Sequence, residues 1–478
     1  MLFNTFQFWL FFSATLALYL TLRREWQNRL LLVASYVFYG FWDPRFLALI
    51  AFSTVVDYFL ARKMSAEESA GKRKLYLWVS VGVNLGVLGI FKYLNFFLAS
   101  TTQALTSLGF EASQPTLSII LPVGISFYTF QTLSYTIDVY RRRLEPVEGF
   151  FDFALFVSFF PQLVAGPIER ARDFLPQLQQ PREVTAQDWG EGLTLILIGL
   201  FKKVAVADQL APLVDQAFGG SAELTSLSLL LGVYFFAFQI YADFSGYTDI
   251  ARGVARMFGF RLTLNFSQPY FATSITEFWR RWHISLSSWL RDYLYISLGG
   301  NRRGKGRTYL NLFATMLLGG LWHGAGFTFV IWGGLHGLYL TVHKLILKDR
   351  PGAPDEVGRV RSAVAAVIKS VALFQFVCLA WIFFRAQSLS DALSYLSRLL
   401  GVQLERDGFR SLSAGEVRPA IWSVLTLLLL VDLPQRLSGR ETAPNHGPRA
   451  WRIASLAVLV LWLIHAEPGG RDFIYFQF

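Results

Sequence analysis

Histidines are the side chains in this sequence that could do acid–base chemistry near neutral pH. Imidazole has an ordinary pKa of about 6.5, so it can accept or donate a proton near pH 7. The chain has six histidines, and four of them, His283, His323, His336 and His343, lie close together in the sequence. This clustering indicates where any chemistry of the protein is concentrated.

His323 lies in a glycine-rich run within an apolar stretch, Gly319-Gly320-Leu321-Trp322-His323-Gly324-Ala325-Gly326. An ionisable side chain at membrane depth is unfavourable and by default marks a functional site. Glycines let a substrate or another helix approach the backbone closely. We therefore predict a functional role for His323. The structural alternative is a histidine packed against a neighbouring helix.

His283 lies in a run rich in tryptophan and arginine, Thr276-Glu277-Phe278-Trp279-Arg280-Arg281-Trp282-His283-Ile284-Ser285-Leu286-Ser287. Phe278, Trp282, Ser285 and Trp289 share one helical face, which predicts an amphipathic helix at the membrane interface. From this pattern alone, a functional His283 and an ordinary membrane-surface helix are equally well supported.

The remaining histidines carry weaker indications. His336 and His343 are seven residues apart and so share a helical face, and both fit structural roles. His446 lies in a loop containing proline and glycine and is expected to be solvated, whereas His465 ends an apolar run. Because no cysteine or carboxylate stands at ligand spacing and no His-Glu-x-x-His run occurs, we expect no metal site.

One basic loop between the two histidine motifs allows two interpretations. It contains Arg302, Arg303, Lys305 and Arg307. The favoured interpretation is a cytoplasmic loop that contacts anionic lipid. The other is that these cations bind the phosphates of a cytosolic nucleotide-bearing donor such as coenzyme A (CoA).

The composition predicts the kind of protein that positions these side chains. Of 478 residues, 53% are apolar and only 16% are charged, and the mean hydropathy is +0.40. A soluble protein has about a quarter charged residues, and a bilayer-crossing helix needs about 20 apolar ones. Long apolar blocks recur along this chain, so we predict an all-α polytopic membrane protein. A soluble globule, a disulfide scaffold and a disordered chain are excluded.

The excess of Lys and Arg over Asp and Glu, 44 − 33 = 11, is explained by cytoplasmic loops rather than by binding to nucleic acid.

The first four apolar blocks alternate with loops whose charge predicts the topology. The blocks cover about residues 6–22, 30–42, 46–60 and 75–98. Residues 23–29 and 62–74 are basic and are placed in the cytoplasm, whereas residues 100–116 contain no Lys or Arg and are placed outside. The N-terminus is then outside, and residues 1–22 are interpreted as a retained span rather than a signal peptide.

Later apolar blocks are interrupted by polar residues, as in 119–139, which contains Pro122 and Gly124, and in 150–167. Such segments occur at membrane depth only where they are buried in protein or line a cavity. Further spans are predicted at about residues 193–207, 227–241, 310–321, 327–342, 364–384, 419–433 and 453–465. The total is roughly eleven to thirteen helices. We expect a single membrane domain, 1–478, made of N-terminal helices (1–140), a catalytic core (141–347), a polar linker (348–361) and C-terminal helices (362–478).

Several motifs in this chain resemble those of the membrane-bound O-acyltransferase (MBOAT) family. They are Glu277–Ser287 with Trp289–Tyr293, Gly320–Ala325, Phe160–Ile168 and Tyr241–Asp249. The ending Phe473–Phe478 is similar to the bacterial branch typified by the alginate O-acetyltransferase membrane subunit. The resemblance covers nearly the whole chain in order, with no departure at these motif positions.

The resemblance implies both a fold and a chemistry. The fold would be a ring of tilted and re-entrant helices around a central tunnel, with His323 as the catalytic residue and His283 as the second polar residue. The reaction would move acetyl groups from cytoplasmic acetyl-CoA, a donor substrate rather than a resident cofactor, across a bacterial inner membrane to an exported polysaccharide such as alginate. A separate periplasmic SGNH-type acetyltransferase would complete the transfer. The chemistry fits the residues, because acyl transfer from a thioester to a hydroxyl needs a base.

Two other functions remain open from the sequence. A member of the same family could transfer another acyl group, such as D-alanyl from a carrier protein to teichoic acid, or acyl groups to cellulose or lipid. A narrow basic cytoplasmic mouth would favour CoA, and a broad docking surface would favour a carrier. A proton-coupled transporter would also have broken helices and midplane histidines. It predicts inverted repeats, and none is visible in the sequence.

Overall fold

The computed structural model of this protein is helical throughout the part of the chain that it describes. It describes residues 1–110, 119–219, 224–346, 356–401, 410–466, 471 and 473–474. These residues contain no β-strand, only one bridge between Leu224 and Arg410. They form two compact units, one of Met1–Gly192 with Val254–Thr263, and one of Leu193–Gly253 with Leu264–Phe478. The all-α prediction is confirmed.

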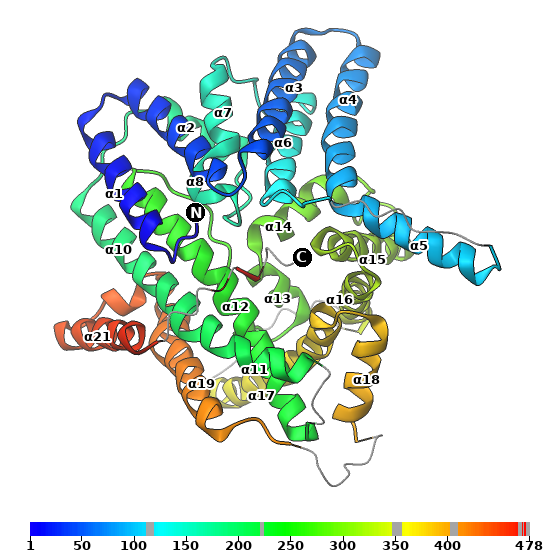
Figure 1. Ribbon diagram of the computed structural model, residues 1–478, viewed down its shortest axis with the longest axis vertical. Helices are drawn as coiled ribbons and strands as arrows, with labels where there is room; N and C mark the ends of the chain where they lie inside the picture. The colour runs from blue at the N-terminus through cyan, green and yellow to red at the C-terminus, as the bar shows by residue number, and fades with distance from the viewer. Residues whose placement is uncertain are drawn as a thin grey trace. The chain divides into compact units, whose positions relative to one another are not determined.

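The first unit contains the N-terminal helices (Figure 1). Its helices are α1 (Phe6–Thr21), α2 (Arg24–Gly40), η1 (Pro44–Phe46), α3 (Leu47–Ala66), α4 (Ala70–Leu88), η2 (Gly89–Tyr93), α5 (Leu94–Ser107), α6 (Ile125–Tyr140), α7 (Phe150–Ser158), α8 (Phe160–Leu163), α9 (Ala171–Gln179) and the start of α10 (Ala186–Leu200). The predicted blocks 6–22 and 46–60 correspond to α1 and α3. The block 75–98 is part of a longer run of helix, 70–107, through α4, η2 and α5.

Helix α6 shows how a polar segment is accommodated at the centre of this unit. Residues before Gly124 are not helical, and α6 starts directly after it. Gly124 has φ +78°, and an added Cβ would lie 2.5 Å from the Leu163 carbonyl oxygen, so glycine is required there. Almost every side chain of α6 is buried. Of the two environments predicted for residues 119–139, burial in protein is the one found for this helix.

Helices α3, α4 and α6 pack together (Figure 1) around a carboxylate. Asp57 on α3 is fully buried and accepts hydrogen bonds from Ser80 Oγ at 2.6 Å and from Asn84 Nδ2 at 2.8 Å, both on α4. Thr132 on α6 donates to the Asn84 side chain at 3.1 Å. These four polar side chains therefore satisfy one another, as most buried polar groups in proteins are satisfied.

The second unit contains the histidine motifs. Its elements are the rest of α10, η3 (Phe201–Ala207), α11 (Asp208–Phe218), α12 (Ser226–Met257, whose last turn belongs to the first unit), η4 (Pro269–Phe271), α13 (Ile275–Arg281), α14 (Ile284–Trp289), η5 (Leu290–Tyr295), α15 (Gly304–His323), α16 (Phe327–Ile346), α17 (Glu356–Arg385), α18 (Leu389–Leu399), α19 (Ala414–Thr426), η6 (Leu427–Asp432), α20 (Leu433–Ser438), η7 (Ala443–Asn445) and α21 (Arg449–His465). The predicted linker 348–361 falls partly outside the described residues, and its last six residues begin α17.

Five described helical stretches are long and apolar enough to cross a bilayer. They are Pro44–Ala66, Ala70–Ser107, Ser226–Met257, Ala363–Arg385 and Ala414–Ser438, and the apolar α1 is shorter. The prediction of a polytopic membrane protein is confirmed. The total number of crossings, the central tunnel and the division of the membrane domain into parts stay predictions.

Two buried lysines fix η3 against α12. Lys203 Nζ lies 2.7 Å from Asp243 Oδ1 and 2.9 Å from Asp208 Oδ1, and Lys202 Nζ lies 2.7 Å from Asp249 Oδ2. Helix η3 can lie this close to α12 because α10, which directly precedes η3, contacts α12 at two glycines. A Cβ on Gly199 would lie 2.6 Å from the Gly246 carbonyl oxygen. The lysines at the centre of predicted span 193–207 therefore form ion pairs inside the protein.

Removing one cation from this network should destabilise the protein strongly. Lys203→Met leaves two buried carboxylates without their ammonium partner, which costs about 3–5 kcal/mol. The matched control is Lys72→Met, because Lys72 forms an exposed pair with Glu67 at 3.8 Å, and such pairs contribute about 0–1 kcal/mol. Thermal unfolding of the purified protein in detergent should show a large loss for the first variant and almost none for the second. Equal unfolding temperatures would show that the network is not structural.

Candidate active site

Two glycine contacts set the geometry of the site by bringing α15 and α16 together (Figure 1). An added Cβ on Gly320 would lie 2.3 Å from the Phe329 carbonyl oxygen, and one on Gly333 would lie 2.4 Å from the Met316 carbonyl oxygen. The two glycines also face each other, with their backbones in contact. Helices in membranes pack at such small-residue contacts. Of the two roles predicted for the glycines near His323, the approach of another helix is the one seen at Gly320.

His323 is the last residue of α15, one turn beyond this contact, and is almost completely buried. Its ring packs against the rings of Trp322, Trp332, Phe384 and His283, at centroid distances of 5.0, 5.0, 5.5 and 6.4 Å. The C-terminal end of a helix carries partial negative charge, which stabilises a positively charged group such as an imidazolium. The position therefore suits a histidine that takes up a proton during a reaction.

The predicted continuous amphipathic helix around His283 is wrong. Helix α13 ends at Arg281 and α14 begins at Ile284, and His283 between them has φ +43°. Asn265, fully buried, supplies the hydrogen bonds that this break requires. Its carbonyl accepts from the Ile284 N–H at 2.9 Å, and its side chain accepts from the Ser285 hydroxyl at 2.9 Å. The helical period of the sequence continues through a position where the backbone turns.

The left-handed backbone of His283 determines where its ring lies. A non-glycine residue in this region is strained by about 1–3 kcal/mol and is found mainly at functional sites. The turn places the fully buried ring 4.7 Å from the ring of Phe244 and beside His323. Burial lowers the pKa of the His283 imidazole to about 3, so the ring is neutral at pH 7. The structure thus brings together the two histidines that the sequence motifs singled out.

His336 lies one aromatic ring away from His323. Its ring contacts Trp332 at 4.8 Å and Trp279 at 5.0 Å, and Trp332 also contacts His323. From the sequence, His336 has no specific predicted role. Trp332, His336 and Tyr339 are four and three residues apart, and this helical spacing could have indicated from the sequence that they form one surface.

The other histidines lie elsewhere. His343 Nδ1 is 3.2 Å from the Thr276 hydroxyl. His446 forms hydrogen bonds with Arg440 and Thr442, and His465 with the Leu461 carbonyl. Among the described residues, no group of three or more His, Cys, Asp or Glu side chains could hold a metal ion.

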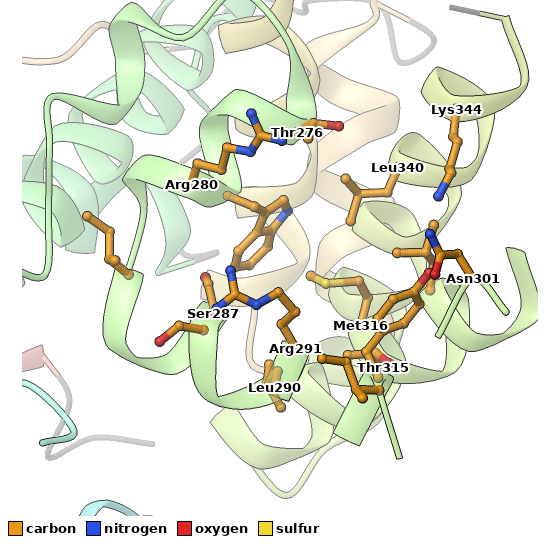
Figure 2. A pocket seen from close by; sticks show the side chains of 16 residues that line it. Thr276, Arg280, Ser287, Leu290, Arg291, Asn301, Thr315, Met316, Leu340 and Lys344 are labelled. Atoms are coloured by element: carbon orange, nitrogen blue, oxygen red, sulfur yellow. The ribbon is translucent and has the colours of Figure 1, made fainter. Parts of the chain in front are cut away.

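A cavity of about 570 Å³ lies between α13, α14, η5, α15 and α16. Its sixteen lining residues include three cations, Arg280, Arg291 and Lys344, and no carboxylate. Figure 2 shows Arg280 and Lys344 on different sides of the cavity, with Asn301 near Lys344. Arg291 also pairs with Asp292 at 2.7 Å. The cavity therefore suits an anionic ligand, and Trp279 in its wall is the residue that contacts His336.

The four cations of the basic loop, for which phosphate binding is the second of two interpretations, are adjacent to this cavity in sequence but do not line it. Arg302 and Arg303 precede α15, and Lys305 and Arg307 lie in its first two turns, all of them exposed. The residue before them, Asn301, does line the cavity. Arg280, Arg291 and Lys344 were not predicted from the sequence, because these residues belong to three different elements.

Known proteins are similar in sequence to this chain, including the region that holds the candidate site. Residues 147–384, which include His283, His323 and His336, match the model of MBOAT, the membrane-bound O-acyltransferase family. A probable alginate O-acetylase of Pseudomonas putida is 46% identical over 393 residues, 81% of this chain and 78% of that protein. The peptidoglycan O-acetyltransferase of Helicobacter pylori is 38% identical over 398 residues, 78% and 73% of the two chains. The teichoic acid D-alanyltransferase of Streptococcus thermophilus is 30% identical over 261 residues, 50% and 62% of the two chains.

The contact between α15 and α16 can be tested with two adjacent glycines. Gly333→Ala places a methyl group against the Met316 backbone, which cannot move aside, and should destabilise the protein by about 1–3 kcal/mol. Gly334 is the matched control, because its added Cβ would meet only the side chains of Leu317 and Phe313, at 3.7 and 3.8 Å. Gly334→Ala should be neutral, or stabilising by up to about 1 kcal/mol, since alanine favours helix. Thermal unfolding in detergent distinguishes them, and equal midpoints would contradict the close contact.

Proposed function

The chain belongs to the membrane-bound O-acyltransferase family and is a multi-pass membrane O-acyltransferase, and from this premise we propose its reaction. It transfers acetyl groups from cytoplasmic acetyl-CoA across the bacterial inner membrane for O-acetylation of an exported polysaccharide, alginate or a similar polymer. The observation that carries the proposal is the buried contact between His323 and His283 in a chain 46% identical to a probable alginate O-acetylase.

His323 acts as the general base in this proposal. The acceptor hydroxyl gives its proton to the His323 imidazole while its oxygen attacks the thioester carbonyl and forms the new C–O bond. The C–S bond of the tetrahedral intermediate then breaks, and the imidazolium returns the proton to the departing thiolate. The aromatic rings around His323 exclude water, which would otherwise compete with the acceptor.

His283 serves as a neutral partner in the same site. A neutral imidazole has one N–H donor and one acceptor nitrogen, so it can orient the acceptor or stabilise the oxyanion without carrying charge. Donors aimed at a developing oxyanion are typically among the largest contributions to acyl transfer. The strained backbone that presents the His283 ring supports such a role over a structural one.

The phosphates of the donor are proposed to bind in the cavity that Trp279 lines. CoA carries several negative charges, and arginine and lysine side chains are the usual phosphate-binding groups. Because so charged a molecule does not cross a bilayer, CoA stays on the cytoplasmic side and the acetyl group passes outward as the ester formed on the acceptor hydroxyl. A separate periplasmic acetyltransferase of the SGNH type would then deliver it to the sugar hydroxyls.

A second acyl donor is kept as the alternative. The teichoic acid D-alanyltransferase of Streptococcus thermophilus shares 30% identity over 50% of this chain. The probable alginate O-acetylase shares 46% over 81%. The greater likeness to an acetylating enzyme favours the acetyl group.

Removing the proposed base should abolish acetylation while leaving the protein in the membrane. His323→Ala is expected to lower acetyl transfer from labelled acetyl-CoA by about 10²–10⁴-fold, the usual contribution of a positioned base. His465→Ala is the control, since His465 is exposed on α21 and should retain full activity. Both variants are compared at equal protein levels in isolated membranes. Normal acetylation by His323→Ala would refute the assignment.

Two sets of variants can show whether the donor phosphates bind in the cavity or at the basic loop. Arg280→Ala and Lys344→Ala should each raise the KM for acetyl-CoA by about tenfold, the loss expected for one charge-assisted hydrogen bond. Their KM for acetyl-pantetheine, which has no phosphate, should not change. If the double variant Arg302→Ala/Arg303→Ala raises the KM for acetyl-CoA instead, the phosphates bind at the loop.

A further inference from the structure

A cluster of four aromatic side chains in the second unit buries polar atoms that no described neighbour satisfies. They are Trp279, Trp332, His336 and Tyr339, which lie on α13 and α16. The two ring nitrogens of His336, the indole nitrogens of both tryptophans and the Tyr339 hydroxyl have no hydrogen-bond partner among the described residues. His336 is fully buried, and Trp332 is 1% and Trp279 is 9% exposed. Most buried polar groups in proteins are satisfied, so a cluster of exceptions requires an explanation.

Packing alone does not explain a histidine at position 336. Its ring stacks on Phe278 with an interplanar angle of 7° and meets Trp279 and Trp332 edge to face. A phenylalanine would fill the same space without burying two polar nitrogens. The imidazole is therefore unfavourable for stability at this position, and both of its nitrogens are left without a hydrogen-bond partner in the described part of the chain.

The location of the cluster indicates which ligand. Trp279 lines the cation-rimmed cavity and contacts His336, while Trp332 contacts both His336 and His323. The unsatisfied polar atoms thus lie between the place proposed for the donor phosphates and the histidine proposed to act on the thioester. In a phosphopantetheine thioester, the part between phosphate and sulfur is an arm with two amides.

We propose that His336 binds an amide of the phosphopantetheine arm of the acyl donor, with Trp279 and Trp332 as further donors. The assignment rests on the proposed acetyl transfer. A neutral imidazole offers one N–H and one acceptor nitrogen, and each indole offers one N–H. These groups match the N–H and C=O of an amide, whereas an ionised phosphate has only acceptors and would leave the acceptor nitrogen of His336 unsatisfied. Trp279, which lines the cavity and contacts His336, is the side chain between the two.

The test is the isosteric variant His336→Phe, assayed with three acetyl donors. These are acetyl-CoA, acetyl-phosphopantetheine, and a carrier protein bearing acetyl-phosphopantetheine, which share the amide arm and differ in the group attached beyond the phosphate. His336→Phe should raise the KM by about tenfold, the loss of one hydrogen bond to the donor, for each donor the wild type uses. The kcat should change little, because His323 is intact. His336→Asn, which restores one amide-bonding group, should recover part of the lost affinity.

Stability gives an independent readout that a structural role would not produce. His336→Phe should unfold in detergent at the same or a higher temperature than the wild type, because it removes unsatisfied polar atoms. His465→Phe is the control, with unchanged KM and kcat. An unchanged KM in His336→Phe, a loss confined to kcat, or a clear drop in unfolding temperature would each overturn the proposal. A wild type that turns over none of the donors would refute the acetyl transfer itself, which separates the two failures.

Discussion

The backbone contact between Gly320 and Gly333 is the constraint on which the site depends. It fixes α15 against α16 at a separation that no side chain larger than hydrogen permits. His323 follows Gly320 by three residues on α15, and His336 follows Gly333 by three residues on α16. One contact between two helices therefore sets the positions of both histidines and of Trp332, whose ring lies between them.

His283 reaches the same place by a different route. Its ring packs on Phe244 of α12, and the residue before Phe244, Asp243, is held by the buried ammonium of Lys203. Asp243 also accepts a hydrogen bond from the Ile474 backbone N–H at 2.7 Å. Buried ion pairs contribute little net stability, but they fix which groups face each other. In this unit they fix the register of the helix that supports His283.

The sequence predicts the helices of this fold better than the contacts between them. Apolar length alone predicts α1 and α3, because a bilayer-crossing helix must be apolar along its length. The break at His283 was missed, since the helical period of Phe278, Trp282 and Ser285 is local while Asn265 acts from another segment. The cavity cations were missed for the same reason, as Arg280 and Lys344 are far apart in sequence. The pairing of His283 with His323 was expected from the resemblance of their motifs to a known family. Their spacing in the sequence does not by itself predict that they meet.

Several departures from ordinary stability rules lie close to His323. His283 has a strained backbone, His336 buries two unsatisfied nitrogens, and Gly320 and Gly333 lie inside helices where alanine would be more favourable. Each is unfavourable by itself, and natural proteins keep such features mainly where function requires them. All of them lie close to His323, while Asp57, Ser80, Asn84 and Thr132 of α3, α4 and α6 hydrogen-bond one another. These features around His323 support the candidate site by an argument from physical chemistry that is separate from the family assignment.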